Sequence, residues 1–366
     1  EYDFKNLEIA DIVNSIIIYA VSKKASDIHF DPCDSGLKVR LRIDGVLQNH
    51  AIVPPLYQKN LITRIKLISN MNITESRLPQ DGAIKSIING IDLDMRVSSL
   101  ATNLGEKIVI RILDYSKSAE GLESLGFSSQ NLKKIKHMIN VPNGIILVTG
   151  ATGTGKSTTV YTMLQTLNKE DTNIITVEDP IEMNIEGINQ VQVNAEIGLT
   201  FGRVLRSILR QDPNIILIGE IRDSETAQIA VRASITGHLV FSTVHTNNSL
   251  STIERLLDMD VERYLLSSAL TGIVSQKLAR KLCPHCRIER ETTQYEKKVF
   301  KEMLNKDVDK IWDVNGSCDK CRNGYVGRIA VQEVLLINDE IRNAINDSSI
   351  SREQLQELVY TDDVTT

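Results

Sequence analysis

Residues 150–157 have the types and the spacing of a phosphate-binding loop, G-x-x-x-x-G-K-[ST]. Three glycines let the backbone wrap a polyphosphate with its N–H groups pointing inward. Lys156 can reach the β- and γ-phosphates of a nucleotide, and the Ser157 hydroxyl can bind Mg²⁺. The candidate nucleotide-binding residues of the loop are Gly150, Ala151, Thr152, Gly153, Thr154, Gly155, Lys156, Ser157 and Thr158.

This chemistry requires a strand before the loop and a helix after it, and both are predicted. Residues 144–149 form an apolar run typical of a buried strand, and residues 157–164 have helical spacing. Strands and helices alternate from about residue 127, which predicts a parallel sheet with crossover helices. The apolar strands are expected at 145–149, 173–178, 214–219 and 239–243. Active sites of such sheets gather at the carboxyl ends of the strands.

Acidic residues follow two of the predicted strands. Glu220 comes after the strand 214–219, where phosphate-loop ATPases hold Mg²⁺, so we expect Glu220 and Ser157 to bind magnesium. Attack of water on a γ-phosphate also needs a group that orients the nucleophile. Glu178, Glu182 and Glu220 could each do this, and Glu182 could equally be a loop acid outside the site.

Two histidines bracket the strand 239–243. His238 precedes this strand and His245 follows it. A polar residue next to a central strand can sense the γ-phosphate, although a single histidine more often has a structural role. We expect His238 to be the one near the nucleotide.

Phosphoryl transfer needs positive charge in addition to Lys156, often from another domain or subunit. Arg96 and Arg111 lie among apolar residues on predicted strands of the N-terminal part. Arg206 and Arg210 lie four apart on one helix face, and Arg328 follows the second cysteine pair. For any single arginine, an ion pair with one of the many acids is the alternative.

Four cysteines form two Cys-x-x-Cys pairs, with 31 residues between the pairs. Such paired knuckles bind Zn²⁺ through four thiolates and leave no open position, so a structural zinc site is expected at Cys283, Cys286, Cys318 and Cys321. The spacing is longer than usual, which predicts a helix between the pairs at 295–304. Four unrelated thiols are the alternative, and Cys33 is expected to be inert.

The composition limits the class of protein. The chain has 366 residues, with 42 basic and 47 acidic side chains, and this net charge of −5 argues against nucleic acid as the main partner. Apolar runs such as 16–18 are far too short to span a membrane. Reduced cysteine pairs and the lack of a signal peptide predict a cytosolic location. Because the first residue is Glu1 rather than Met, we expect a fragment of a longer chain.

The predicted organisation is an α/β protein with a smaller N-terminal α+β domain. That domain is expected at 1–115, with two helices and two hairpins that turn at 44–45 and 89–90. A linker is expected at 116–126 and the ATPase domain at 127–366. The ATPase domain would include a zinc-binding subdomain at about 280–325 and short helices at about 336–360.

Several longer motifs resemble the secretion ATPase superfamily, which comprises the motors of type II secretion and type IV pilus assembly. Matching signatures lie at 25–29, 42–45, 77–82, 105–107, 175–182, 209–223 and 236–247. The resemblance implies a hexameric RecA-like motor that hydrolyses ATP, with a PAS-like N-terminal domain. It also implies that Arg96 and Arg111 reach the nucleotide phosphates, and that Arg206, Arg210 and Arg328 lie near the site or a subunit interface.

The resemblance further implies a peripheral position at the inner face of the cytoplasmic membrane, where the motor drives an inner-membrane platform protein. Four zinc-binding cysteines are typical of assembly and secretion motors rather than of retraction motors. The chain is rich in Ile, Asn and Lys, which indicates an AT-rich genome, and on this ground we expect type IV pilus assembly. Type II secretion is the alternative. A nucleic-acid translocase and a nucleotide-binding scaffold without hydrolysis are less favoured.

Overall fold

A computed structural model describes residues 3–4, 6–88, 91–113, 121–321, 323–361 and 364. The chain divides into two compact units, Glu1–Asp114 with Arg280–Gly327, and Tyr115–Ala279 with Arg328–Thr366. The segment 280–325, which is expected to belong to the ATPase domain, groups with the first unit instead. Part of the expected linker lies outside the described residues. The rest holds the 3₁₀ helix η2 (Leu122–Leu125), whose Leu122 is buried.

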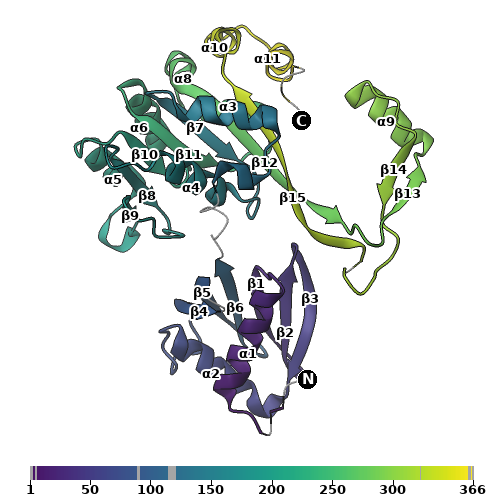
Figure 1. Ribbon diagram of the computed structural model, residues 1–366. Coiled ribbons are helices and arrows are strands. Elements are labelled where there is room, and N and C mark those ends of the chain that lie inside the picture. Colours follow the sequence, from purple (N-terminus) through teal and green to yellow (C-terminus); the bar gives the residue numbers. More distant parts are fainter. Residues whose placement is uncertain are drawn as a thin grey trace. The chain divides into compact units, whose positions relative to one another are not determined.

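Within the described residues, the first unit contains a six-stranded antiparallel sheet in the order β3-β2-β1-β6-β5-β4. Helices α1 (Ile9–Ser22) and α2 (Pro55–Ile68) pack on one face of it (Figure 1). The strands are β1 (Asp27–Cys33), β2 (Gly36–Ile43), β3 (Val46–Val53), β4 (Gln80–Ile88), β5 (Ile91–Thr102) and β6 (Gly105–Leu113).

Strand β2 illustrates why this sheet forms. Leu37, Val39 and Leu41 are buried against the helices, while the basic residues between them face the other side. The predicted turn into β3 is present: Asp44 and Gly45 have φ of 51° and 83°, as a two-residue hairpin turn requires. The second predicted turn, 89–90, lies outside the described residues. The narrower expectation of a PAS-like domain stays a prediction.

The segment between the two cysteine pairs forms a small separate structure. The predicted helix is present as α9 (Gln294–Leu304), which begins with a capping box made by Thr293 and Glu296. An antiparallel pair of strands, β13 (Ile288–Glu291) and β14 (Lys310–Asp313), flanks this helix in the chain. Neither strand is predicted from the sequence, because each is only four residues long.

Among the described residues, the second unit contains a seven-stranded sheet in the order β15-β12-β7-β11-β10-β8-β9. Strands β7 to β12 pair in parallel, as the alternating pattern predicts. The strands are β7 (Gly144–Thr149), β8 (Ile174–Glu178), β9 (Asn189–Gln192), β10 (Ile215–Ile218), β11 (Leu239–Val244), β12 (Leu270–Leu282) and β15 (Tyr325–Leu336).

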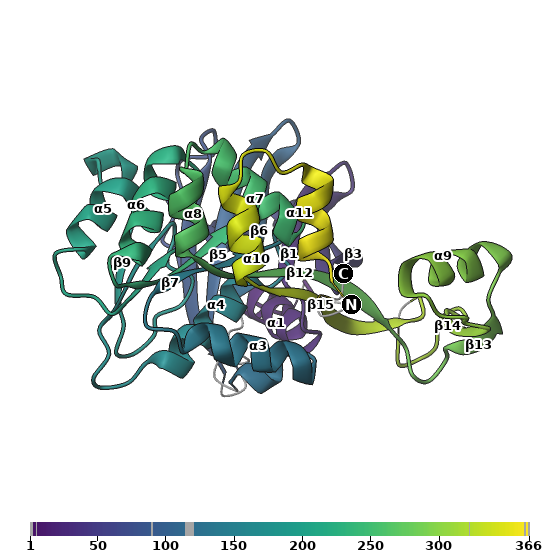
Figure 2. The same cartoon turned by 90° about the horizontal axis from the view of Figure 1, so that it is seen from above.

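Helices cover both faces of this sheet, so the central strands are apolar throughout (Figure 2). On β7, Ile145 and Leu147 face one helical layer, and Ile146 and Val148 face the other. The first layer comprises α5 (Phe201–Ile208), α6 (Ser224–Ile235), α7 (Ser249–Asp258), α8 (Arg263–Ala269), α10 (Asp339–Asn346) and α11 (Arg352–Val359). The second layer comprises α3 (Ser129–Ile139) and α4 (Lys156–Leu167).

This arrangement confirms the predicted fold class, a parallel-sheet α/β core with a smaller α+β part. The C-terminal helices α10 and α11 fall where the sequence predicts them. No helix in the described part of the chain is both long and apolar enough to cross a bilayer.

Candidate nucleotide-binding site and metal centre

The phosphate-binding loop joins β7 to α4, in the strand–loop–helix context that its sequence predicts. Gly155 has φ of 89° and caps α4, which begins at Lys156. A Cβ on Gly150 would lie 2.3 Å from the backbone oxygen of Gln276, and φ at Gly150 is 148°. Both positions therefore require glycine, and the N-terminus of α4 faces the space that the loop encloses.

Lys156 lies over its own loop. Its Nζ donates to the backbone oxygens of Gly150 at 2.8 Å and Ala151 at 3.0 Å, and the residue is only 8% exposed. Burial lowers the pKa of this amine, and the negative charge of Glu220 partly opposes that shift. The cation is thus held at the loop, close enough to Glu220 to sense its charge.

Glu220 lies two residues beyond β10, at the carboxyl edge of the sheet, and faces basic groups. Its Oε1 forms an ion pair with Nη2 of Arg222, and its Oε2 lies 3.7 Å from Nε2 of His245. Asp179 approaches the same guanidinium, with its Oδ2 3.9 Å from Nη1. The hydrogen bond to Glu220 raises the pKa of Arg222. The loop, Glu220 and His245 therefore share one charged site.

The structure places the two histidines contrary to expectation. His238 precedes β11 and its backbone oxygen accepts from the N–H of Gly144, the first residue of β7. The phosphate loop follows the last residue of β7, so His238 lies at the opposite end of the sheet from the loop. His245 lies at the loop's end instead. Burial, and then the charge of Lys156, lower the pKa of His245, which favours a neutral imidazole.

Glu178 is the last residue of β8 and is only 3% exposed. Its Oε1 accepts hydrogen bonds from Thr176 Oγ1 at 2.6 Å and Gln190 Nε2 at 3.1 Å. Its Oε2 accepts from the hydroxyl of Tyr161, on α4. Both oxygens are thus occupied inside the protein, and this geometry assigns Glu178 no open face toward a nucleotide. Its predicted catalytic role stays a prediction, and Glu220 is the better-placed acid.

The candidate arginines are distributed over both units. Arg96 and Arg111 belong to the first unit, where they lie directly opposite each other on β5 and β6. Arg206 pairs with Glu225 at 2.5 Å, and Arg210 donates to the backbone oxygen of Arg206 at 2.8 Å. Arg328 is exposed on β15. The ion pair of Arg206 agrees with the alternative that these arginines only form ion pairs with acidic residues. The roles of the five arginines at a nucleotide stay predictions.

Gln276 supports the loop from β12 and is not among the site residues predicted from the sequence. Its Nε2 donates to the backbone oxygen of Thr154 at 2.8 Å, and its Oε1 accepts from Thr159 Oγ1 at 2.9 Å. The residue is 2% exposed, so these bonds have no competition from bulk water. The sequence gives no sign that Gln276 contacts the loop, because β12 is not predicted as a strand beside β7.

We expect Gln276→Leu to weaken ATP binding roughly tenfold. Leucine keeps most of the volume but leaves Thr154 and Thr159 without their partner, which costs about 1–2 kcal/mol. Titration with a fluorescent ATP analogue measures the affinity. Lys277→Ala changes the next, exposed residue of β12 and is the control. Equal affinity in the two variants would show that Gln276 does not support the loop.

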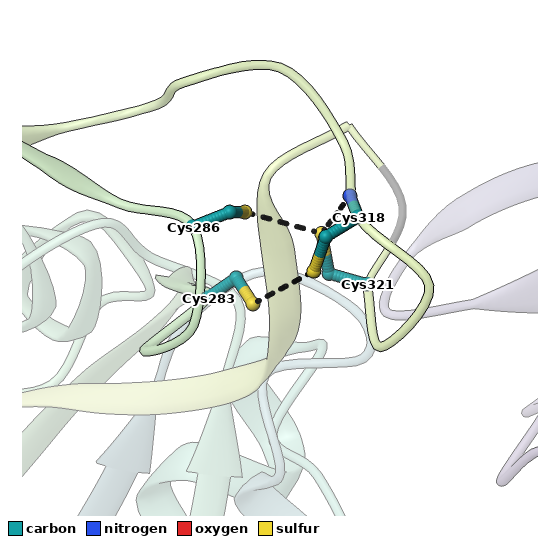
Figure 3. Close-up of side chains that lie close together, drawn as sticks. All are labelled: Cys283, Cys286, Cys318 and Cys321. Atoms are coloured by element: carbon teal, nitrogen blue, oxygen red, sulfur yellow. Dashed lines mark hydrogen bonds between the residues drawn. The ribbon is translucent and has the colours of Figure 1, made fainter.

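The two cysteine pairs come together in one cluster (Figure 3). All four sulfur atoms lie within 4.8 Å of one another. The Sγ atoms of Cys283 and Cys318 are 3.9 Å apart, and those of Cys286 and Cys321 are 3.5 Å apart. Tetrahedral Zn²⁺ with Zn–S bonds of about 2.3 Å requires S–S separations of about 3.8 Å. The four thiols therefore fit a structural zinc ion, and the alternative of four unrelated thiols does not hold.

The backbone prepares one thiol for metal binding. The N–H of Cys318 donates to Sγ of Cys321 at 3.3 Å. This backbone hydrogen bond is the largest cause that lowers the pKa of Cys321, to about 6. A thiolate is the form that binds zinc, so the bond favours the ligating state.

We expect Cys318→Ser to abolish tight zinc binding and to loosen the segment 280–327. Three thiolates remain, and structural zinc sites contribute on the order of 10 kcal/mol to folding in small peptides. Metal analysis of the purified protein and limited proteolysis measure the two effects. Cys33→Ser lies outside the cluster and should retain the metal of the unaltered chain. Equal metal content in both variants would contradict the assignment.

A parallel sheet with a phosphate loop after β7 and an acid beyond β10 defines a nucleotide-binding ATPase fold. More narrowly, the chain belongs to the type II/IV secretion system protein family, whose model matches residues 4–365.

Three relatives show the character of this family. Type II secretion system protein E of Aeromonas hydrophila is 45% identical over 342 residues, which cover 93% of this chain and 68% of the relative. The protein of the same name from Dickeya dadantii is 47% identical over 345 residues, 92% of this chain and 67% of the relative. Type II secretion system ATPase E of Vibrio cholerae is 44% identical over 342 residues, with coverages of 93% and 68%.

Solved structures agree in fold. The pilus retraction motor PilT, crystallised with ADP, gives a TM-score of 0.63 at 28% identity, covering 96% of this chain and 88% of that one. The ATPase DotB of Legionella pneumophila gives 0.69 at 19% identity, with coverages of 97% and 90%. The predicted superfamily is thus confirmed. The names of the sequence relatives favour type II secretion over the expected pilus assembly. That expectation relied on amino-acid composition, which carries little information about what the machinery transports.

Proposed function

We propose that this chain is the ATPase of a type II secretion system, which hydrolyses ATP to ADP and phosphate and couples the reaction to mechanical work. The observation that carries the proposal is the meeting of Lys156, Glu220 and His245 at the carboxyl edge of the sheet. The relatives named type II secretion system protein E support the choice of transport system.

In this proposal the loop binds the phosphates of ATP through its backbone N–H groups and the N-terminus of α4. Lys156 exchanges the two loop oxygens for the β- and γ-phosphate oxygens, which are better partners for a partly buried cation. Mg²⁺, bound by the Ser157 hydroxyl and Glu220, would neutralise charge on the transferred group.

Glu220 and His245 then act on the attacking water. Glu220 has one oxygen paired with Arg222, so the other is directed toward His245 and the loop. A neutral His245 can accept or donate a hydrogen bond, and can thereby order a water molecule between itself and the carboxylate. Arginines of the first unit would add positive charge, which Lys156 alone does not supply.

The wider setting is proposed from the family. We expect a homo-hexamer that works at the inner face of the cytoplasmic membrane with an inner-membrane platform protein and the secretion machinery. The net charge of −5 gives no support to nucleic acid as a partner. Zinc, bound by the four cysteines, would stabilise the segment that carries them and take no part in hydrolysis.

Phosphate release from Mg·ATP by the purified chain tests the enzymatic part of the proposal. Release above that of Lys156→Ala supports an ATPase, and release equal to it would revive the non-hydrolysing scaffold. The same assay with added DNA tests the translocase, which predicts stimulation. Deletion of the gene tests the biology: loss of exported enzymes supports type II secretion, whereas loss of surface pili with normal export supports pilus assembly.

A further inference from the structure

The buried carboxylate of Glu178 is held by side chains from three elements. Thr176 lies on β8, Gln190 on β9 and Tyr161 on α4, the helix that begins at the phosphate loop. A buried charge is tolerated only where hydrogen bonds replace its lost hydration. Glu178 therefore fixes Tyr161, which is itself fully buried, in one orientation.

The Tyr161 hydroxyl has a second partner. Besides donating to Glu178, it accepts from the backbone N–H of Glu182 at 3.1 Å. One hydroxyl thus holds both ends of the segment 178–182 against the phosphate-loop helix. Because a phenol has one donor and two acceptor positions, phenylalanine can replace neither bond.

The held segment also contains Asp179, whose carboxylate approaches the guanidinium of Arg222. Arg222 is more than half exposed, so its position depends on Asp179 on one side and Glu220 on the other. An exposed arginine without fixed partners samples many rotamers, and its ion pairs are then weak. The position of the segment therefore contributes, through Asp179, to the way in which Arg222 is held against Glu220.

We propose that Tyr161 is a positioning residue for hydrolysis. Its hydroxyl fixes the segment 178–182 on the phosphate-loop helix, so that Asp179 and Arg222 hold Glu220 with one oxygen free for the reaction. This inference rests on the proposed ATPase function. It gives Glu178 a supporting role in place of contact with the nucleotide.

The test is Tyr161→Phe, which keeps the buried ring and removes only the hydroxyl. We expect kcat to fall about 10- to 100-fold, because small misplacement of a catalytic group has effects of this size. The affinity for a fluorescent ATP analogue should change less than threefold, since the loop itself is untouched. Tyr264→Phe, at an exposed tyrosine of α8, is the matched control and should leave kcat unchanged.

A second variant separates positioning from stability. Tyr161→Phe leaves the Glu178 charge short of a donor, and Glu178→Gln in the same chain removes that charge. We expect the double variant to regain part of the melting temperature lost in Tyr161→Phe, because the buried charge is gone, while its kcat stays 10- to 100-fold below that of Glu178→Gln, because Glu182 still lacks its acceptor. If Tyr161 only stabilises the fold, kcat and melting temperature recover together, which overturns the proposal.

The outcomes distinguish this inference from the function on which it rests. A wild-type chain without phosphate release contradicts the ATPase itself. An active wild-type chain with normal turnover in Tyr161→Phe contradicts only the positioning role. If the single variant does not fold, the double variant and Glu178→Gln are compared by themselves, and equal kcat in the two refutes the role of the hydroxyl.

Discussion

Glu220→Gln is expected to reduce phosphate release about 10²- to 10⁴-fold while the chain still binds ATP. Glutamine keeps the shape of the side chain but loses the charge that would hold Mg²⁺ and orient the water molecule. The phosphate loop, with Lys156 and the supporting Gln276, stays intact. Single-turnover phosphate release and titration with a fluorescent ATP analogue measure the two effects separately.

A matched glutamate controls for the change itself. Glu254 lies on α7 and forms an ion pair with Arg352 at 2.9 Å, outside the nucleotide site. Glu254→Gln should leave turnover unchanged, because partly exposed pairs of this kind contribute about 0–1 kcal/mol to stability. Normal turnover in Glu220→Gln would exclude Glu220 as the carboxylate that orients the attacking water. Glu182 would then be the next candidate for this role.

The sheet of the second unit could be predicted from the sequence because its signals are local. Each central strand is a short apolar run buried by helices on both faces, and such runs are visible without knowledge of their neighbours. The phosphate loop is equally local, since its glycines and Lys156 are contiguous. The cysteine cluster could be predicted from spacing alone, because each pair brings two thiols to one turn.

The side-chain partners of the site could not be predicted in this way. Glu178 and Glu220 both follow apolar strands, but Glu178 is still part of β8, where the pleat directs it with Thr176 toward α4. Glu220 lies beyond the end of β10 and is free of that constraint. The sequence pattern does not show where pleating stops, so the two acids look alike.

The positions of the two histidines and of Gln276 could not be predicted for a different reason, which is that they depend on strand pairing. Which end of β11 meets the phosphate loop depends on the pairing of β11 with β7, a contact between residues about 95 positions apart. With parallel pairing, the residue after the strand lies at the loop, which selects His245 over His238. Gln276 reaches the loop only because β12 pairs with the other edge of β7.

Arg111→Ala is expected to lower turnover by about 10³-fold, if this arginine supplies charge to the transferred phosphoryl group as the family resemblance implies. Its side chain is 60% exposed, and its one described ion pair joins Nε to Oδ1 of Asp27 at 3.0 Å. Asp27 keeps a second cation in the variant, since Nε of Arg42 lies 3.6 Å from its other oxygen. The fold of the first unit should therefore lose little stability.

Arg40→Ala provides the comparison, because Arg40 lies on the same sheet and forms a shorter ion pair, 2.6 Å, with Asp31. If the arginines of this sheet act only through ion pairs, Arg40→Ala should lower the melting temperature at least as much as Arg111→Ala, and neither should affect kcat. If Arg111 contacts the transferred phosphoryl group, kcat falls in Arg111→Ala alone, while the melting temperature of Arg111→Ala stays close to that of the wild type. Turnover within threefold of the wild type in Arg111→Ala would remove this arginine from the mechanism, and Lys156 would then need its additional positive charge from Arg96 or from a neighbouring subunit.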